Sequence, residues 1–187
     1  MNYEIGLVKN QQTAKFANCY IKNLDLNNIN QIIALQKNII ALIPDNDLFH
    51  PFSENEIKQL FTQSENIILG VFTDDNSLIA FRAATADGIE FDEINYFLEN
   101  KYSSYKKLLL NGAFVDEHYR GNRLQVKMSE YTIDIAKKRN IDLLFTVIHP
   151  ENTPSIKSIT SLGFKEIREI NVYIHQHRRL LFIKELQ

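Results

Sequence analysis

Hydrophobic positions recur with a helical period near the N-terminus of the chain. Isoleucines at positions 29, 32, 33, 40 and 43 fall close to one 3.6-residue stripe, which predicts a helix over residues 27–42 with Asp25 as its N-cap. We expect Pro44-Asp45-Asn46 to end this helix. Ser53 and Glu56 have the S-x-x-E spacing of a capping box, so a second helix is predicted to begin there.

The next segments carry apolar runs of strand length. Residues 16–21 form a short strand-like stretch, and the runs 66–73 and 78–84 are joined by the turn formers Asp74-Asp75-Asn76-Ser77, which predicts a β-hairpin. Residues 85–105 then interrupt the pattern with five acidic residues before Lys101: Asp87, Glu90, Asp92, Glu93 and Glu99. An acidic lid is one interpretation. Composition favours the other, a solvated loop with a short helix near residues 92–98.

Strands and helices alternate from Leu108 onward. The run 108–115 predicts a strand, and apolar residues then recur along one helix face at Leu124, Met128, Tyr131 and Ile135. A strand over 141–148 follows. Thr153 before Pro154 is typical of an N-cap with proline at the first helical position, and Gly163 is typical of a C-cap. A last strand pair, 164–174 and 178–183, surrounds His175-Gln176-His177.

This order of elements predicts an α/β fold with a mixed sheet. With 187 residues, 44 % of them hydrophobic, the chain is expected to form a single domain over 1–187 with an insertion at about 85–105. The longest apolar run is Ile67–Phe72, too short for a membrane span, and Met1–Gln12 lacks the basic and apolar parts of a signal peptide. We therefore expect a cytoplasmic protein that does not bind a membrane.

Charge and cysteine content exclude further classes. The formal net charge of −2 offers no broad basic face, so a nucleic-acid partner is not expected. Cys19 is the single cysteine, which excludes an internal disulfide and a cysteine-based metal site, and no metal is predicted. We expect Cys19 to be a buried, inert thiol.

The most informative segment is 115–125, where a strand leaves through Gly121 into a helix. Such a turn presents several main-chain N–H groups at a helix N-terminus, where unpaired donors and the helix dipole favour an anion. Arg120, Arg123 and Lys127 add positive charge, so a diphosphate fits the segment. The chain contains neither a G-x-x-x-x-G-K-[ST] loop nor a G-x-G-x-x-G fingerprint, so the common nucleotide sites lack their key residues.

Tyr119–Gln125 resembles the pyrophosphate-binding loop of the GNAT N-acetyltransferase superfamily, Q/R-x-x-G-x-G/A. Arg120 takes the first position, while Arg123 and Gln125 stand at the two small positions. A second segment, Asn152–Ile156 running to Leu162-Gly163-Phe164, resembles the N-x-x-A/S-I … L-G-F segment of that superfamily. Together the two matches cover roughly residues 108–164, and the first hundred residues agree only in the order of elements.

The resemblance implies a fold and a ligand. The fold would be a mixed, mostly antiparallel sheet of about six to seven strands flanked by helices, with the strands ending near Val115 and starting at Ile141 splayed apart to admit coenzyme A. Acetyl-CoA would be the co-substrate, and the main chain of Phe114 and Val115 would bond its pantetheine arm and thioester. The implied CoA-binding residues are Phe114, Val115, Arg120, Gly121, Asn122, Arg123, Leu124, Gln125, Asn152 and Ser155.

The implied activity is direct transfer of an acetyl group to a primary amine of a small amine, a peptide N-terminus or a lysine, by a monomer or homodimer. Many relatives take their base from a glutamate on the strand before the loop, yet 107–114 contains no carboxylate. Asp116 and Glu117 follow directly and, with Asn152, are the catalytic candidates. Alternatively, Asp87 or Glu90 acts through a water, whereas His118 and His149 are more typical of surface or supporting residues.

The general acid is equally open. The family tyrosine position holds Ile159, beside Ser158. Either the thiolate departs unaided, or Tyr173 or Tyr131 substitutes, or activity is weak.

Two other classes of function stay open. Arg123, Gln125 and Ile159 are compatible with a relative that binds CoA without turnover, as a sensor or assembly partner. An unrelated α/β domain whose turn binds another phosphate ligand, or none, is the third.

Overall fold

A computed structural model describes residues 3–42, 51–172 and 177–186. Eight strands form one sheet in the order β1-β2-β3-β4-β5-β6-β8-β7. Their bounds are β1 Tyr3–Lys9, β2 Phe16–Asn23, β3 Ile67–Thr73, β4 Leu78–Thr85, β5 Lys107–Val115, β6 Leu143–Ile148, β7 Lys165–Val172 and β8 His177–Glu185. Every neighbouring pair is antiparallel except β5 and β6, which are parallel. The predicted mixed, mostly antiparallel sheet is therefore confirmed.

The sheet has one strand more than predicted. The additional strand is β1, which lies at the edge and buries only Val8. Tyr3, Ile5 and Leu7 alternate along this strand, a pattern that the sequence prediction did not include, and Tyr3 and Leu7 are exposed. Its hydrogen bonds to β2 form the outermost ladder, on the side of the sheet away from β7.

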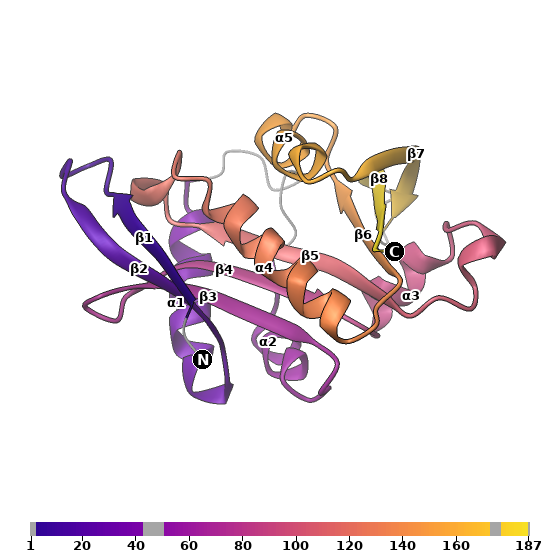
Figure 1. The fold of residues 1–187 in the computed structure, drawn as a ribbon, viewed down its shortest axis with the longest axis horizontal. Coiled ribbons are helices and arrows are strands. Elements are labelled where there is room, and N and C mark those ends of the chain that lie inside the picture. The colour runs from indigo at the N-terminus through magenta and orange to yellow at the C-terminus, as the bar shows by residue number, and fades with distance from the viewer. Residues whose placement is uncertain (1–2, 43–50, 173–176, 187) are drawn as a thin grey trace.

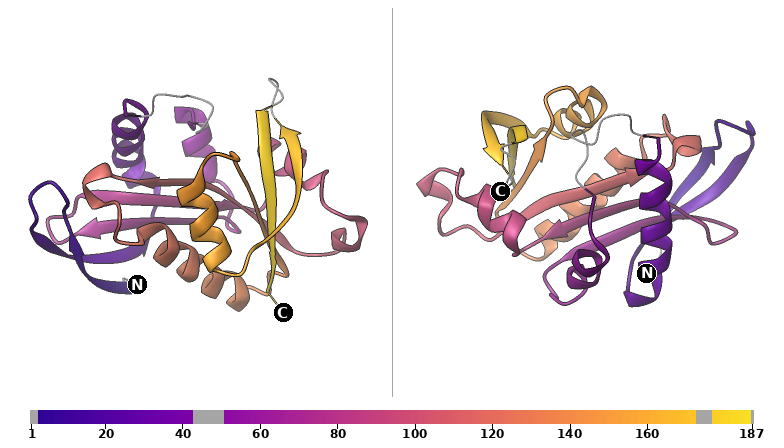
Figure 2. Two further views of the ribbon diagram at one scale, coloured as in Figure 1. Left: turned by 90° about the horizontal axis from the view of Figure 1, so that it is seen from above. Right: turned by 180° about the vertical axis from the view of Figure 1, so that it is seen from behind.

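Helices cover both faces of the sheet (Figures 1 and 2). Their bounds are α1 Ile29–Ile40, α2 Glu54–Leu60, α3 Ile89–Asn95, α4 Leu124–Lys138 and α5 Thr153–Ser161, with short 3-10 turns at Leu26–Asn28, Asn100–Tyr102 and Glu117–Tyr119. In Figure 1, α4 crosses the front of β3, β4 and β5, while α1 and α2 lie behind the sheet. No helix in the described part of the chain is both long and apolar enough to span a membrane.

Local signals placed most helix ends correctly. Ser53 and Glu56 form the predicted capping box. The prediction that Asp25 caps the first helix was wrong: Asp25 caps the 3-10 turn Leu26–Asn28, and the N-cap of α1 is Asn28. Gly163 has φ of +80°, as a helix C-cap requires. The prediction for α5 was wrong by one residue: Asn152, not Thr153, is the N-cap, because its Oδ1 accepts from Ser155 N. Pro44–Asn46, His175 and Gln176 lie outside the described residues.

Residues 85–105 are neither a detached lid nor a solvated loop. Their short helix, α3, begins at Ile89 rather than near Asp92. Ile94 and Tyr102 are buried in the cluster that β6, β7 and β8 complete, and Tyr102 Oη donates to Glu185 Oε1 at 3.0 Å. Composition could not predict this outcome, because two buried side chains anchor an otherwise acidic surface segment.

Candidate functional site

Strands β5 and β6 separate halfway along their length. Their parallel ladder contains only three pairs, from Lys107 with Leu143 to Leu109 with Phe145. Thr146 Oγ1 donates to Leu110 O at 2.8 Å just beyond the last pair. On the other edge of β5, the register with β4 shifts between Arg82 and Ala83, beside a left-handed Gly112 with φ of +58°. This bulge and the short ladder produce the predicted splay between the central strands.

The turn after β5 directs its main chain outward. Asp116 Oδ1 accepts from His118 N at 2.9 Å and fixes the start of the turn, and Gly121 has φ of +81°. Among the described residues, no acceptor bonds the six consecutive amides of residues 121–126. The first turn of α4 begins within this run, so the turn and the helix N-terminus offer unpaired donors together.

Arg123 has an unusual backbone conformation in this turn. Its φ is +57°, in the left-handed region that glycine favours, and it stands where the GNAT pattern has its glycine. Arg123 therefore replaces the glycine of the pattern but adopts a backbone conformation that glycine favours.

The turn forms one end of a groove of about 640 Å³. Nine of the ten predicted CoA-binding residues line the groove: Phe114, Val115, Arg120, Gly121, Arg123, Leu124, Gln125, Asn152 and Ser155. The sequence therefore predicted which residues of β5, the turn, α4 and α5 meet around one groove.

Two of the predicted polar side chains point elsewhere. Asn122 Nδ2 donates to Lys9 O at 2.8 Å and its Oδ1 accepts from Lys9 N, so this side chain anchors β1 instead of lining the groove. Lys127 Nζ donates to Ile5 O at 3.1 Å and is likewise committed to β1. Only Arg120 and Arg123 of the three predicted cations line the groove.

The main chains of Phe114 and Val115 face opposite sides of β5, so they cannot both bond a ligand in the groove as predicted. Asp116 N donates to Ile79 O, and facing pairs in an antiparallel ladder alternate between bonded and non-bonded. Counting back two residues, the main chain of Phe114 faces β4, whereas that of Val115 faces the splay. Arg120 Nε donates to Val115 O at 3.4 Å, in agreement with this orientation. Val115 N points to the same side, so a ligand in the groove can reach this amide, whereas it cannot reach the main chain of Phe114.

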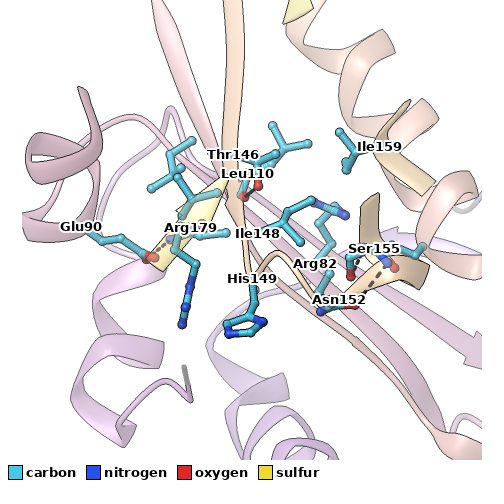
Figure 3. Close-up of a pocket in the computed structure, with 16 residues that line it drawn as sticks. Arg82, Glu90, Leu110, Thr146, Ile148, His149, Asn152, Ser155, Ile159 and Arg179 are labelled. Carbon is cyan, nitrogen blue, oxygen red and sulfur yellow. Dashed lines mark hydrogen bonds between the residues drawn. The ribbon is translucent and has the colours of Figure 1, made fainter. Parts of the chain in front are cut away.

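A smaller cavity of about 120 Å³ lies in the splay (Figure 3). It shares Ala113, Gln125, Asn152 and Ser155 with the groove. Gln125 Nε2 lies 3.4 Å from Ser155 Oγ, so α4 and α5 approach each other at the boundary. The groove and the cavity therefore adjoin at these residues.

Two polar atoms of the cavity wall lack hydrogen-bond partners among the described residues: Arg82 Nε and Asn111 Oδ1. Arg82 is only 2 % exposed, and burial lowers its pKa to about 10, so it keeps its charge at neutral pH. A buried donor without a partner costs about 1–3 kcal/mol. Sequence analysis missed Arg82; its signal was a lone charge within the apolar run 78–84.

Acidic side chains lie where the cavity adjoins a second pocket. Glu90 and Asn111 line both the cavity and a neighbouring pocket of about 390 Å³, to which Glu56 and Asp87 also contribute. Asn111 Nδ2 donates to Glu90 Oε2 at 3.1 Å. By contrast, Asp116 and Glu117 line neither the cavity nor the groove. Of the carboxylates considered from the sequence, the structure brings Glu90 to the splay.

The proposed substitutes for a general acid lie in different places. Ile159 is buried in the cavity wall. Ser158 lines the groove, but its Oγ donates to Pro154 O at 2.9 Å. Tyr131 stacks on Tyr3 with ring centroids 5.2 Å apart, away from the splay. Tyr173 lies outside the described residues.

Three candidates from the sequence remain, namely His149, His118 and Cys19. His149 lines the cavity, and its Nδ1 accepts from Glu151 N at 3.2 Å, while His118 lies beside Glu117 at the outer turn. Cys19 is buried, as predicted, and burial raises its pKa to about 11. Its thiol is therefore neutral at physiological pH and inert as a nucleophile.

Comparison with known proteins identifies the fold. No protein-family model and no curated protein sequence matches the chain. Solved structures do match. The ribosomal-protein-S5-alanine acetyltransferase from Vibrio fischeri has a TM-score of 0.69 at 15 % identity, covering 92 % of this chain and 96 % of that one. The acetyltransferase of GNAT family from Streptococcus pneumoniae has a TM-score of 0.66 at 14 % identity, with 90 % and 99 % covered.

A third similar structure contains a ligand. The NatC complex bound to Gag peptide and CoA includes a chain with a TM-score of 0.65 at 19 % identity, with 90 % of this chain and 99 % of that one covered. At these identities the comparisons establish the fold.

Proposed function

Because the chain has the fold of the GNAT N-acetyltransferases, we propose that it binds acetyl-CoA and transfers the acetyl group to a primary amine. One observation carries the proposal: six consecutive unbonded amides, 121–126, lie at the end of a groove that leads into the splay between β5 and β6. A diphosphate accepts from such donors at a helix N-terminus. A chain joined to the diphosphate then reaches the splay along the groove.

Different residues of the groove contact different parts of coenzyme A. Arg120 and Arg123 supply charge beside the unbonded amides, which favours a diphosphate. The main chain of Val115 faces the pantetheine arm from one side, and Asn152 and Ser155 face it from the other. Asn152 already holds the first turn of α5 through Ser155 N, so its amide side chain is fixed in place.

The chemistry requires a base more than an acid. An amine attacks in its neutral form, and deprotonating a lysine-like amine with a pKa near 10.4 costs about 4–5 kcal/mol at pH 7. The departing thiol has a pKa near 8.5, so release as thiolate costs only about 2 kcal/mol. A C–N bond forms as the C–S bond breaks, and the amine proton must leave the nitrogen.

Glu90 is the base in this proposal. It lies where the acidic pocket opens into the cavity, so an amine that enters from the pocket passes it on the way to the thioester. It accepts the amine proton directly or through one water. Glu56 and Asp87, on the same pocket, attract a protonated amine toward the opening. The thiolate leaves unaided, because the described residues lining the cavity include no tyrosine.

The alternative is a protein that binds CoA without turnover. The observation that favours it is Ile159, a buried aliphatic side chain at the position of the family's acid. Free-thiol release from acetyl-CoA, measured with a panel of amines and with a blank lacking amine, separates the two. We expect amine-dependent release of thiol. CoA binding by calorimetry without any amine-dependent release would establish the alternative, and absence of CoA binding would refute both.

A further inference from the structure

We propose that the cavity in the splay is a carboxylate-binding subsite, in which the guanidinium of Arg82 binds a carboxylate that belongs to one of the two substrates. This inference rests on the proposed function, because it specifies the substrates of the same site. The carboxylate comes either from the acyl chain of the CoA thioester or from the acceptor beside its amine.

The first observation is that Arg82 is buried and that its Nε has no hydrogen-bond partner among the described residues. Arg82 lies on β4 between Ala80 and Ala84, which pack into the cluster beneath α4, so the alternation of the strand directs Arg82 to the same face. It is 2 % exposed, and no described residue accepts from its Nε. Buried arginines are normally paired with an anion. Arg82 therefore has an open position for one.

The second observation is the charge of the cavity wall. Arg179, 5 % exposed, is a second buried cation on the wall, and its Nη1 donates to Arg178 O at 2.8 Å. Glu90 is the acidic side chain among the described lining residues. Among the described lining residues, two of the three Arg and Glu side chains are cations, which favours an anionic ligand.

The third observation is the small volume and the position of the cavity. A space of about 120 Å³ holds a carboxylate and a short linker, not a large acceptor. The cavity adjoins the groove at Ser155 and the acidic pocket at Glu90. The carboxylate therefore arrives attached to a substrate, from either side. Asn111 Oδ1, the unbonded acceptor in the same wall, fits the ammonium or amide N–H of such a substrate.

Two comparisons on the wild-type protein identify the source of the carboxylate. The donor comparison measures the affinity of succinyl-CoA against acetyl-CoA by calorimetry. The acceptor comparison measures kcat/KM for small α-amino acids against the matched amines that lack the carboxylate, for example alanine against ethylamine, with acetyl-CoA as donor. We expect a preference of about ten- to hundredfold for the carboxylate in one comparison. No preference in either overturns the subsite.

Substitution of Arg82 tests whether this residue carries the preference. Arg82→Met removes the charge at similar volume, so the carboxylate preference should fall to within about twofold of unity while the melting temperature of the free protein holds or rises. The matched control is Arg168→Met, an exposed arginine on β7, which should keep the preference. If the methionine variant does not fold, Arg82→Lys replaces it, and the preference should drop about tenfold because the two-pronged contact is lost.

Failure of the subsite and failure of the proposed function give different results. An unchanged preference in the folded Arg82 variant overturns the subsite. If that variant still binds CoA, the proposed function is not contradicted. If the wild-type protein binds no CoA, both the subsite and the proposed function are refuted.

Discussion

The two proposed binding regions, the turn at 121–126 and the cavity in the splay, offer different groups to a ligand. The turn offers main-chain amides, whose direction depends on backbone conformation and only weakly on side-chain identity. The cavity offers the side chains of Arg82, Asn111 and Glu90, each of which one substitution removes. The comparison teaches that the donors of the turn tolerate changes of side chain as long as the backbone keeps its conformation, whereas the cavity depends on the identity of single side chains.

Arg123 shows that the turn depends on backbone conformation more than on side-chain identity. It replaces the glycine of the motif and keeps the left-handed backbone with φ of +57°. A non-glycine residue in that region costs roughly 1–3 kcal/mol, which the surrounding turn must offset. A motif recognised by its glycines is therefore obscured here, although the amides keep their outward direction.

The largest effect is expected on the side of the cavity, from Glu90→Gln. Glutamine keeps an acceptor for Asn111 Nδ2 but cannot take a proton, so kcat should fall about hundredfold with CoA affinity unchanged. Steady-state rates and calorimetry with CoA check the two values. Asp116→Asn and Glu117→Gln are the controls. A larger loss of kcat in either control than in Glu90→Gln would show that Asp116 or Glu117, not Glu90, is the base.

The next largest effect is expected at the turn, from Gly121→Val. Valine is strained at φ of +81°, so the turn should shift and CoA affinity should fall about ten- to hundredfold in calorimetry. Gly6→Val is the matched control, because Gly6 has φ of +77°, open space around it and a position on edge strand β1. Equal affinity for CoA in both variants would contradict the role of the turn.

A smaller effect is expected from Arg120→Ala. Arg120 lines the groove beside the unbonded amides but is exposed to solvent, so removing it should weaken CoA binding about five- to tenfold. The dependence of affinity on salt should decrease as well. Lys138→Ala, at the far end of α4, is the control of equal charge and should bind CoA as the wild type does. Indistinguishable salt dependence in the two variants would argue against a charge contact.

The smallest effect is expected from Arg123→Gly, and it sharpens the comparison because it restores the glycine of the motif. Glycine relieves the left-handed strain, so the free energy of unfolding should rise by up to about 1 kcal/mol despite the greater freedom of the unfolded chain. CoA affinity should stay within about threefold, since one charge is lost while the amides stay in place. Denaturant titration and calorimetry check both values. A loss of stability would show that the Arg123 side chain, not its backbone, holds the turn.

The same contrast explains what the sequence allowed us to predict. Ser53, Gly163 and the turn at 74–77 act through local backbone geometry, and their elements were predicted correctly. The groove residues on β5, the turn and α4 followed from their order, because strand, turn and helix N-terminus are adjacent in the chain. Asn152 and Ser155, at the start of α5, followed from the resemblance of their segment to the family pattern.

The features that were missed depend on contacts between distant segments. Strand β1 has one buried residue and pairs only with β2. Asn122 and Lys127 turn toward that strand, a choice that no local pattern encodes. Arg82 joins the cavity because β4 lies beside the bulge at Gly112, and Glu90 reaches it because Ile94 and Tyr102 anchor the segment around α3.

The central claim is that main-chain amides of residues 121–126 bind the diphosphate of coenzyme A. Titration of CoA into ¹⁵N-labelled protein, followed by amide resonances, tests it most directly. We predict the largest shifts at amides 121–126, with slower solvent exchange of the same protons on saturation. Saturable CoA binding that leaves these six amides unshifted would contradict the claim.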